Sequence, residues 1–295
     1  MKNFRFTRRE FLGTATVTAG AVLAPACTTL AAKRSATDTV TLGKTGIKLS
    51  RLGIGLGSSS GNVQRNLGQE EFNRLVRYAF DQGIRYFDCA QSYKTFDWIA
   101  DAVKDFPRKE IFLMSKIGGN PEKPMEVIEN HLKTYATDHI DCILSHCAVK
   151  GDWMEERART LEALELAKQQ GKIRAHGVSC HALPALRVAA ASPWVDVNLV
   201  RVNPQCKATD GETPQWNAPG TAIEPVVEQL KVMRKNGHGV IAMKLIGDGA
   251  FKEPDDRERA MRFAMSIPEI DAAVIGFKSP AEIDESIARM NRALA

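Results

Sequence analysis

The chain has 295 residues, of which 40 are Lys or Arg and 35 are Asp or Glu, so its formal net charge at pH 7 is +5. A hydrophobic content of 44% and a charged content of 25% exclude a disordered chain, a collagen-like chain and a polytopic membrane protein. This charge would indicate a polyanionic partner only if it were concentrated, and the place where it gathers is the N-terminus.

Residues 1–26 have the pattern of an export signal. A basic head precedes an uncharged, mildly apolar stretch that ends in small residues suited to a signal peptidase. Within the head, Thr7-Arg8-Arg9-Glu10-Phe11-Leu12 resembles a twin-arginine signal. The resemblance implies export through the twin-arginine translocase and a periplasmic location. An ordinary basic start before a first helix is the alternative.

Cys27 directly follows Ala26, and this junction also resembles a lipoprotein cleavage site, which implies a lipid anchor on Cys27. Removal of residues 1–26 would take away four basic residues and one acidic residue and leave a net charge of about +2. A nucleic-acid partner is therefore not expected. The six cysteines show no Cys-x-x-Cys pair and no Cys/His ligand spacing, so we expect buried free thiols and no metal site.

From residue 39 onward, short apolar runs alternate with longer amphipathic segments. The turn Gly43–Gly46 lies between two short apolar runs and predicts a β-hairpin before the first barrel strand. The runs predicted to be strands are 51–57, 84–88, 110–116, 139–146, 173–179, 195–200, 239–243 and 272–277. The segments predicted to be helices are 69–82, 96–106, 124–137, 155–170, 181–191, 221–236, 254–266 and 280–294.

Eight β-α units in strict order predict an α/β fold with a parallel sheet, and about 250 residues suffice to close it into a (β/α)8 TIM barrel. We expect residues 27–38 to be a linker and residues 39–295 to be one barrel domain with an N-terminal β-hairpin. An open, doubly wound nucleotide-binding sheet is the alternative, because Gly53, Gly55 and Gly57 form a glycine-rich run at the first predicted barrel strand. That fingerprint is incomplete, since serines occupy the places of its third glycine.

Polar residues stand where successive predicted strands end. Asp88 ends the second strand, Lys116 the third and His146 the fourth, and Tyr93 lies in the loop after Asp88. In a barrel, the carboxyl ends of the strands build the active site. Each residue alone has another explanation: Asp88 could cap a helix, Lys116 could be a solvated strand end, and His146 could be a hydrogen-bonded histidine at the rim. Together they predict a catalytic cluster.

Five segments carry a resemblance to a known family: Leu52–Gly55, Tyr86–Tyr93, Met114–Lys116, Asp138–Asp141 with His146, and Gly171–Ser179. On these segments the chain resembles the aldo/keto reductase superfamily over residues 40–292. The resemblance implies a catalytic tetrad of Asp88, Tyr93, Lys116 and His146. It also implies an NAD(P)H-dependent oxidoreductase that reduces an aldehyde or ketone to an alcohol.

In this interpretation Tyr93 is the general acid that protonates the alkoxide left by hydride transfer. A phenol with a pKa of about 10 needs a neighbouring cation, which Lys116 would supply while Asp88 holds the ammonium group in place. His146 would donate a hydrogen bond to the carbonyl oxygen.

The cofactor residues implied by the resemblance are less regular. Ser179 matches the family, whereas Cys180 replaces an Asn, Leu199 a Gln, and Met243 the aromatic residue that stacks on nicotinamide. A thiol bonds an amide weakly and Leu not at all, but Met can still cover the ring. Two residues nearby have open roles: Lys244 either reaches a phosphate or is solvated, and Asn203 either replaces a missing amide contact or is a turn residue.

The end of the barrel resembles the family's clamp on the adenosine phosphate, with the candidate residues Lys278, Ser279, Glu282 and Glu285. Helix starts bind anions, which suits Lys278 and Ser279. Glu282 stands where the family commonly has an arginine, and a carboxylate suits a ribose hydroxyl better than a 2′-phosphate. NADPH is favoured slightly over NADH by family habit.

Substrate residues are the hardest to assign. The long segment 201–220 is expected to overhang the mouth of the barrel, so Trp216, Trp98 and Asn203 are candidates for contacting a small carbonyl substrate. Packing within the fold is the alternative for both tryptophans. Two other functions stay open: an exported binding or accessory barrel with little turnover, and a redox protein whose cofactor stays tightly bound.

Overall fold

The structure is a computed structural model that describes residues 34–216 and 218–295. The export signal predicted for residues 1–26, the lipid anchor predicted at Cys27 and most of the predicted linker lie outside the described residues.

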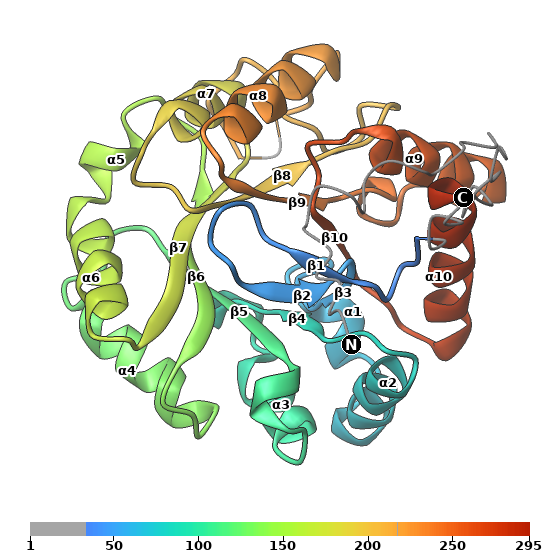
Figure 1. Cartoon of the computed structure of the whole chain (residues 1–295), viewed down its shortest axis with the longest axis horizontal. Coiled ribbons are helices and arrows are strands. Elements are labelled where there is room, and N and C mark those ends of the chain that lie inside the picture. Colours follow the sequence, from blue (N-terminus) through green and yellow to red (C-terminus); the bar gives the residue numbers. More distant parts are fainter. Residues whose placement is uncertain (1–33, 217) are drawn as a thin grey trace, which may run out of the picture. The chain divides into compact units, whose positions relative to one another are not determined.

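Eight parallel strands form a closed barrel in which the last strand pairs with the first (Figure 1). The predicted TIM barrel is confirmed, and the open nucleotide-binding sheet is excluded because Gly53 and Val274 pair across the closing seam. The strands are β3 (Leu52–Gly55), β4 (Tyr86–Asp88), β5 (Phe112–Gly118), β6 (Ile140–Ala148), β7 (Ile173–Cys180), β8 (Val197–Arg201), β9 (Gly239–Met243) and β10 (Ala272–Ile275).

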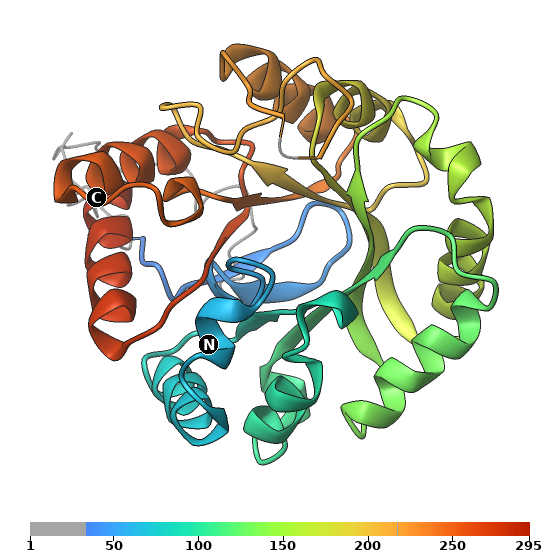
Figure 2. The same ribbon diagram turned by 180° about the vertical axis from the view of Figure 1, so that it is seen from behind.

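A ring of helices surrounds the barrel, as seen from both sides in Figure 1 and Figure 2. Five of them have a proline in the first turn, where the missing N–H costs no intrahelical hydrogen bond. The helices are α2 (Gln69–Asp81), α3 (Phe96–Val103), α4 (Pro124–Thr134), α6 (Ala158–Gln169), α7 (Leu183–Ala191), α8 (Glu224–Lys235), α9 (Pro254–Ser266) and α10 (Pro280–Leu294).

Short helical pieces lie in the connections. They are α1 (Asn62–Arg65), α5 (Trp153–Glu156) and the 3-10 turns η2 (Gln91–Tyr93), η3 (Arg108–Glu110) and η4 (Gly247–Gly249). The helix predicted to begin at residue 155 begins at Ala158 instead. The reason is Arg157, whose φ of −118° and ψ of 20° are not helical and separate α5 from α6.

The predicted hairpin is present as β1 (Thr39–Thr41) and β2 (Lys48–Ser50), which pair antiparallel. Its turn fits against the starts of β9 and β10: Gly43 N–H donates to Asp271 Oδ2 at 3.0 Å. Gly43 has a φ of +50°, and a Cβ there would lie 2.3 Å from Gly239 N, so only glycine fits. The buried side chains of Leu42, Ile47 and Leu49 join the cluster that fills the lumen. The hairpin therefore closes the amino-terminal end of the barrel, and the site must form at the opposite end.

Among residues 34–216 and 218–295, no helix is long and apolar enough to cross a membrane. Within the same ranges, no three or more His, Cys, Asp and Glu side chains gather in a way that could hold a metal ion. The cysteines in the described part of the chain are free thiols at Cys89, Cys142, Cys147, Cys180 and Cys206.

Candidate active site

The four residues of the predicted tetrad meet at the carboxyl ends of the strands. Lys116 Nζ donates to Asp88 Oδ1 at 2.5 Å and to the carbonyl oxygen of Cys89 at 2.8 Å. The same ammonium group lies 5.1 Å from the centre of the Tyr93 ring. The Tyr93 hydroxyl is 3.2 Å from His146 Nε2. The four side chains thus lie in one continuous row in the order Asp88, Lys116, Tyr93 and His146.

The Lys116–Asp88 ion pair is buried, with side chains 1% and 7% exposed. Burial raises the pKa of Asp88, and the attraction of Lys116 opposes this rise without cancelling it. Removing one member of such a pair leaves an uncompensated charge, which costs about 3–5 kcal/mol. The buried ion pair therefore holds the side chains of Lys116 and Asp88 in place, and the two charges largely neutralise each other.

The pKa of Tyr93 is shifted in the opposite direction from the prediction, in which the cation of Lys116 lowers it. Burial raises the pKa of Tyr93 well above its usual value, and the negative charge of Asp88 adds to the effect. The physical reason is that Asp88 accompanies Lys116 and offsets the benefit of its cation, while the phenol is packed among the surrounding side chains. Tyr93 therefore keeps its proton in this state, as a proton donor must.

His146 is a neutral imidazole. Burial lowers its pKa to about 3, and the cations Lys116, Arg157 and Lys244 lower it further in the same direction. Its ring meets the Tyr93 ring edge to face, with centroids 5.5 Å apart. A neutral imidazole has one N–H, which can donate to an oxygen placed beside the Tyr93 hydroxyl.

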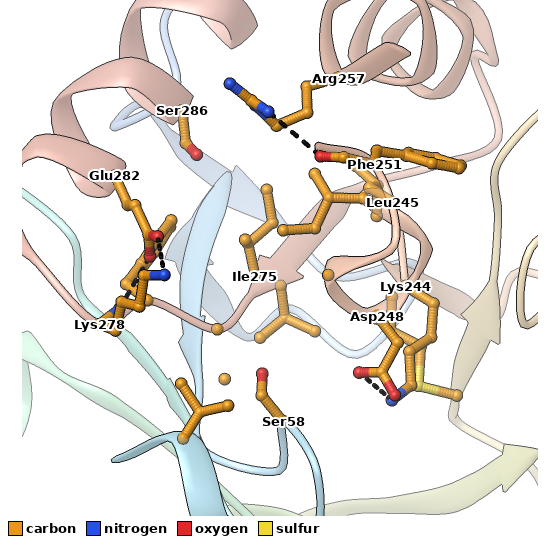
Figure 3. A pocket seen from close by; sticks show the side chains of 18 of the residues that line it. Ser58, Lys244, Leu245, Asp248, Phe251, Arg257, Ile275, Lys278, Glu282 and Ser286 are labelled. Atoms are coloured by element: carbon orange, nitrogen blue, oxygen red, sulfur yellow. Dashed lines mark hydrogen bonds and ion pairs between the residues drawn. The ribbon is translucent and has the colours of Figure 1, made fainter. Parts of the chain in front are cut away.

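A cleft of about 470 Å³ extends from Tyr93 to α10, and Figure 3 shows part of its lining. It lies between the loops that follow β3, β9 and β10. Of the predicted cofactor residues, five line it: Met243, Lys244, Lys278, Glu282 and Glu285. The volume is within the range of small-molecule sites.

Two ion pairs, each made of a lysine and a carboxylate, lie on either side of this cleft in Figure 3. On one side Lys244 Nζ lies 2.7 Å from Asp248 Oδ1. On the other, Glu282 accepts the Lys278 N–H at 2.9 Å, and its carboxylate is 3.6 Å from the Lys278 ammonium. The Ser279 hydroxyl accepts the N–H of Glu282 at 3.4 Å and caps α10. Glu282 thus places a carboxylate at a helix start that would otherwise attract an anion.

Glu285 lies between two arginines that the sequence did not indicate. Its Oε1 accepts from Arg257 Nε and from Arg289 Nε, each at 2.8 Å. Burial works against ionisation of Glu285, but the two arginines outweigh it and lower the pKa. Ser58, Asp248 and Ser286 also line the cleft and were missed. The serine-rich loop after Gly57 was the available signal for Ser58; the arginines are on α9 and α10, whose side-by-side packing no local pattern shows.

Ser179 and Cys180 lie outside the cleft lining. The Ser179 hydroxyl accepts the backbone N–H of Cys147 at 2.9 Å, so it supports the strand of His146. The Cys180 side chain belongs to the core between sheet and helices, with Val178, while alternate residues of β7 such as Ala175 face the lumen. The structure therefore gives Ser179 a supporting contact and Cys180 a place in the core, and their contacts with nicotinamide stay a prediction.

The three predicted substrate residues are separated in space. Trp98 packs its ring edge to face on Phe72, 5.7 Å away, in the helix layer. Asn203 is buried, and its amide nitrogen donates to the carbonyl oxygens of Lys207 and Lys244 at 2.7 and 3.1 Å. Trp216 is 58% exposed and does not belong to the lining of the cleft. The three residues therefore do not form one wall around a substrate in this structure.

The lining of the cleft is chemically suited to a dinucleotide. Glycines line its walls where backbone must approach closely: a Cβ at Gly57 would lie 2.5 Å from the Tyr93 ring, and one at Gly276 would lie 2.0 Å from Ser58 Oγ. Gln64, buried behind this wall, joins the two loops by donating to the carbonyl oxygens of Gly55 and Phe277. Met243 at one end can cover a flat ring, and the start of α10 lies at the other.

This fold and constellation define a (β/α)8-barrel enzyme with its site at the carboxyl ends of the strands. Residues 51–262 match the model of the Aldo/keto reductase family, and the chain belongs to that family.

Known proteins resemble the chain at moderate identity. The "Probable aldo-keto reductase 1" of Glycine max is 28% identical over 228 residues, which cover 72% of this chain and 60% of the relative. The "Glycerol 2-dehydrogenase (NADP(+))" of Hypocrea jecorina is 26% identical over 203 residues, 57% of this chain and 61% of the relative. Both matches thus span less than two thirds of the relative. The holo form of an aldo-keto reductase from Bacillus halodurans has a TM-score of 0.67 and 18% identity, covering 87% of this chain and 95% of that one.

Proposed function

We propose that this protein is an NAD(P)H-dependent reductase that converts a small aldehyde or ketone to an alcohol. The observation that carries the proposal is the 3.2 Å contact between the Tyr93 hydroxyl and His146 Nε2, with the buried Lys116–Asp88 pair next to the Tyr93 ring. A protonated phenol and a neutral imidazole at one point form a site for a carbonyl oxygen that gains negative charge. The alcohol–carbonyl chemistry in the name of the Hypocrea jecorina relative supports the same reaction class.

The proposed mechanism assigns each residue one task. When bound in the cleft, the reduced nicotinamide supplies hydride to the carbonyl carbon. His146 donates a hydrogen bond to the carbonyl oxygen and orients it. Tyr93 transfers its proton to that oxygen as negative charge develops there, which completes the alcohol. Lys116, held by Asp88, stabilises the phenolate that Tyr93 becomes, and the raised pKa of Tyr93 ensures that the proton is present beforehand.

Turnover by Tyr93→Phe tests this mechanism. The substitution removes the proton donor and keeps the ring, so kcat for aldehyde reduction is expected to fall about 10²- to 10⁴-fold. Binding of the reduced cofactor, followed by its fluorescence, should stay as in the wild type. Unchanged turnover would remove Tyr93 from the acid role.

Family habit slightly favours NADPH, but we propose NADH as the preferred cofactor. The support is Glu282, whose carboxylate already occupies the start of α10 and accepts the Lys278 N–H. A second anion at this position would meet repulsion, whereas a ribose hydroxyl could donate to the carboxylate. Lys278, Arg257 and Arg289 each have an acidic partner, so they offer little unpaired charge to a 2′-phosphate. Equilibrium titration with both reduced cofactors checks this, and tighter NADPH binding would contradict it.

We also propose that residues 1–26 direct export of the folded barrel through the twin-arginine translocase to the periplasm, with Cys27 as a lipid-anchor site and 39–295 as the working domain. The support is the Arg8-Arg9 pair ahead of Phe11-Leu12 and the small residues before Cys27. Intact-mass analysis of protein from the periplasmic and membrane fractions reports cleavage and any lipid. Retention of residues 1–26 in both fractions would contradict this proposal.

A further inference from the structure

Strand β6 is irregular at the point where it presents His146. Its register with β7 pairs Ser145 with Val178 and Ala148 with Cys180, so His146 and Cys147 together face a single residue, Ser179. This is a β-bulge, and bulges are often found beside active sites, where they redirect a side chain. Cys147 has a φ of +57°, a left-handed conformation that costs a non-glycine residue of order 1 kcal/mol. Other contacts must therefore hold the bulge in place.

One of these contacts is the Ser179 hydroxyl, which accepts the Cys147 N–H. The others come from the guanidinium of Arg157. Its NH1 donates to the His146 carbonyl oxygen at 2.6 Å and to Ser145 Oγ at 3.0 Å, and its NH2 donates to the Cys147 carbonyl oxygen at 2.9 Å. A planar guanidinium can satisfy several acceptors at fixed geometry, which a lysine cannot do.

Arg157 reaches the bulge from the outer side of the barrel. It stands at the break between α5 and α6, and its acceptor Ser145 alternates with Cys142 and Leu144, which face the lumen. No atom of Arg157 appears in the lining of the cleft. Two routes therefore connect Arg157 with the site: its hydrogen bonds to the backbone of residues 145–147, and its positive charge, which helps to lower the pKa of His146.

We propose that Arg157 is a positioning residue that fixes the bulge and thereby sets the place of the His146 imidazole against the Tyr93 hydroxyl. The hydrogen bonds replace strand pairing that the bulge interrupts, and without them two carbonyl oxygens in a partly buried position lose their donors. The bulge could then relax toward regular pairing and turn the imidazole away from Tyr93. The kinetic part of this proposal rests on the proposed function; the structural part does not.

Two measurements on Arg157→Met test it, with Arg159→Met as the matched control. Arg159 lies two residues further along, in the first turn of α6; it is exposed and donates to the Asn120 carbonyl oxygen away from the bulge. The first measurement is the imidazole Cε1–Hε1 resonance of His146 by NMR, assigned by its loss in His146→Gln. We expect this resonance to shift in Arg157→Met and also in Arg157→Lys, which keeps the positive charge but not the forked contacts, and not to change in Arg159→Met.

The second measurement is a double-mutant cycle on kcat. We expect Arg157→Met to lower kcat about 10- to 100-fold, with cofactor affinity unchanged, since small displacements of a positioned group cost this much. In a His146→Ala background the same substitution should have no further effect, because the group it positions is gone. A full additional loss in that background, or an unmoved His146 resonance, would overturn the proposal.

Arg157→Lys keeps the charge and removes the fork, and it replaces Arg157→Met in both measurements if the latter does not fold. Its His146 resonance should also shift; a wild-type spectrum and rate in Arg157→Lys would show that the forked contacts are not needed and would overturn the proposal. If the wild-type protein reduces no carbonyl, the proposed function fails, and the NMR measurement alone still decides whether Arg157 positions His146.

Discussion

The two ends of the cleft each contain a lysine–carboxylate pair, but the pairs differ in their contact with water. Lys116 and Asp88 are 2.5 Å apart and almost fully buried. Lys278 and Glu282 are 3.6 Å apart, with side chains 65% and 38% exposed. Coulomb interactions are several-fold stronger in the first setting than in the second. In the proposed function, chemistry takes place at the dry end, and cofactor choice depends on the wet end, where the groups can change without loss of the fold.

The largest effect is expected for Lys116→Met, which would break the dry pair. Asp88 would be left buried without a cation, so the free energy of unfolding should fall by about 3–5 kcal/mol, and reductase activity should be lost. Denaturant unfolding measures the first effect and steady-state kinetics the second. Lys116→Met with Asp88→Asn should recover part of the stability but none of the activity; a stable, active Lys116→Met would break the comparison.

The next effect concerns pH at the dry end. The pKa of His146 is about 3 in the folded state and about 6.5 in the unfolded chain. Between these pH values only the unfolded chain binds the proton. The contribution of His146 to the free energy of unfolding is therefore fully present above pH 6.5 and is lost progressively as the pH falls. The loss from this residue is about 2 kcal/mol at pH 5. In His146→Gln, the drop in the free energy of unfolding between pH 7 and pH 5 should be smaller by about 2 kcal/mol, as measured by denaturant unfolding at both pH values. An unchanged drop would show that His146 is solvated in the folded protein.

A smaller effect is expected at the wet end from Glu282→Arg. Replacing the carboxylate with a guanidinium should shift the NADPH/NADH affinity ratio toward NADPH by about tenfold or more, since 1.4 kcal/mol of charge interaction suffices. Titration of both cofactors measures the ratio. Glu122→Arg, at an exposed position before α4, is the matched control and should leave it unchanged.

The smallest effect is expected for Lys278→Met, the wet-end counterpart of Lys116→Met. Exposed pairs contribute about 0–1 kcal/mol, so the unfolding free energy should change by no more than that. Denaturant unfolding at low and high salt measures it. A loss as large as that of Lys116→Met would show that the two ends do not differ as described.

The sequence was most informative where function follows strand ends. Asp88, Lys116 and His146 could be predicted because each stands at the end of an apolar run, and a barrel brings such ends together. The bulge beside Ser179 could not be predicted, because no periodicity shows that the Ser179 hydroxyl accepts the Cys147 N–H. Arg257 and Arg289 were missed because their meeting at Glu285 depends on how α9 and α10 pack. The direction of the Tyr93 pKa depended on burial, which residue types alone do not give.

Closure of the barrel joins the two ends of the described chain. Strand β10 lies between β3 and β9, and the N-terminal hairpin contacts Asp271 just before β10. During synthesis the ring therefore stays incomplete until the last of its strands has left the ribosome. A premature stop before Ala272 would leave β3 and β9 as unpaired sheet edges, which are sites of aggregation. Truncated products are thus expected to be insoluble, and only a chain that includes β10 can form a finished barrel.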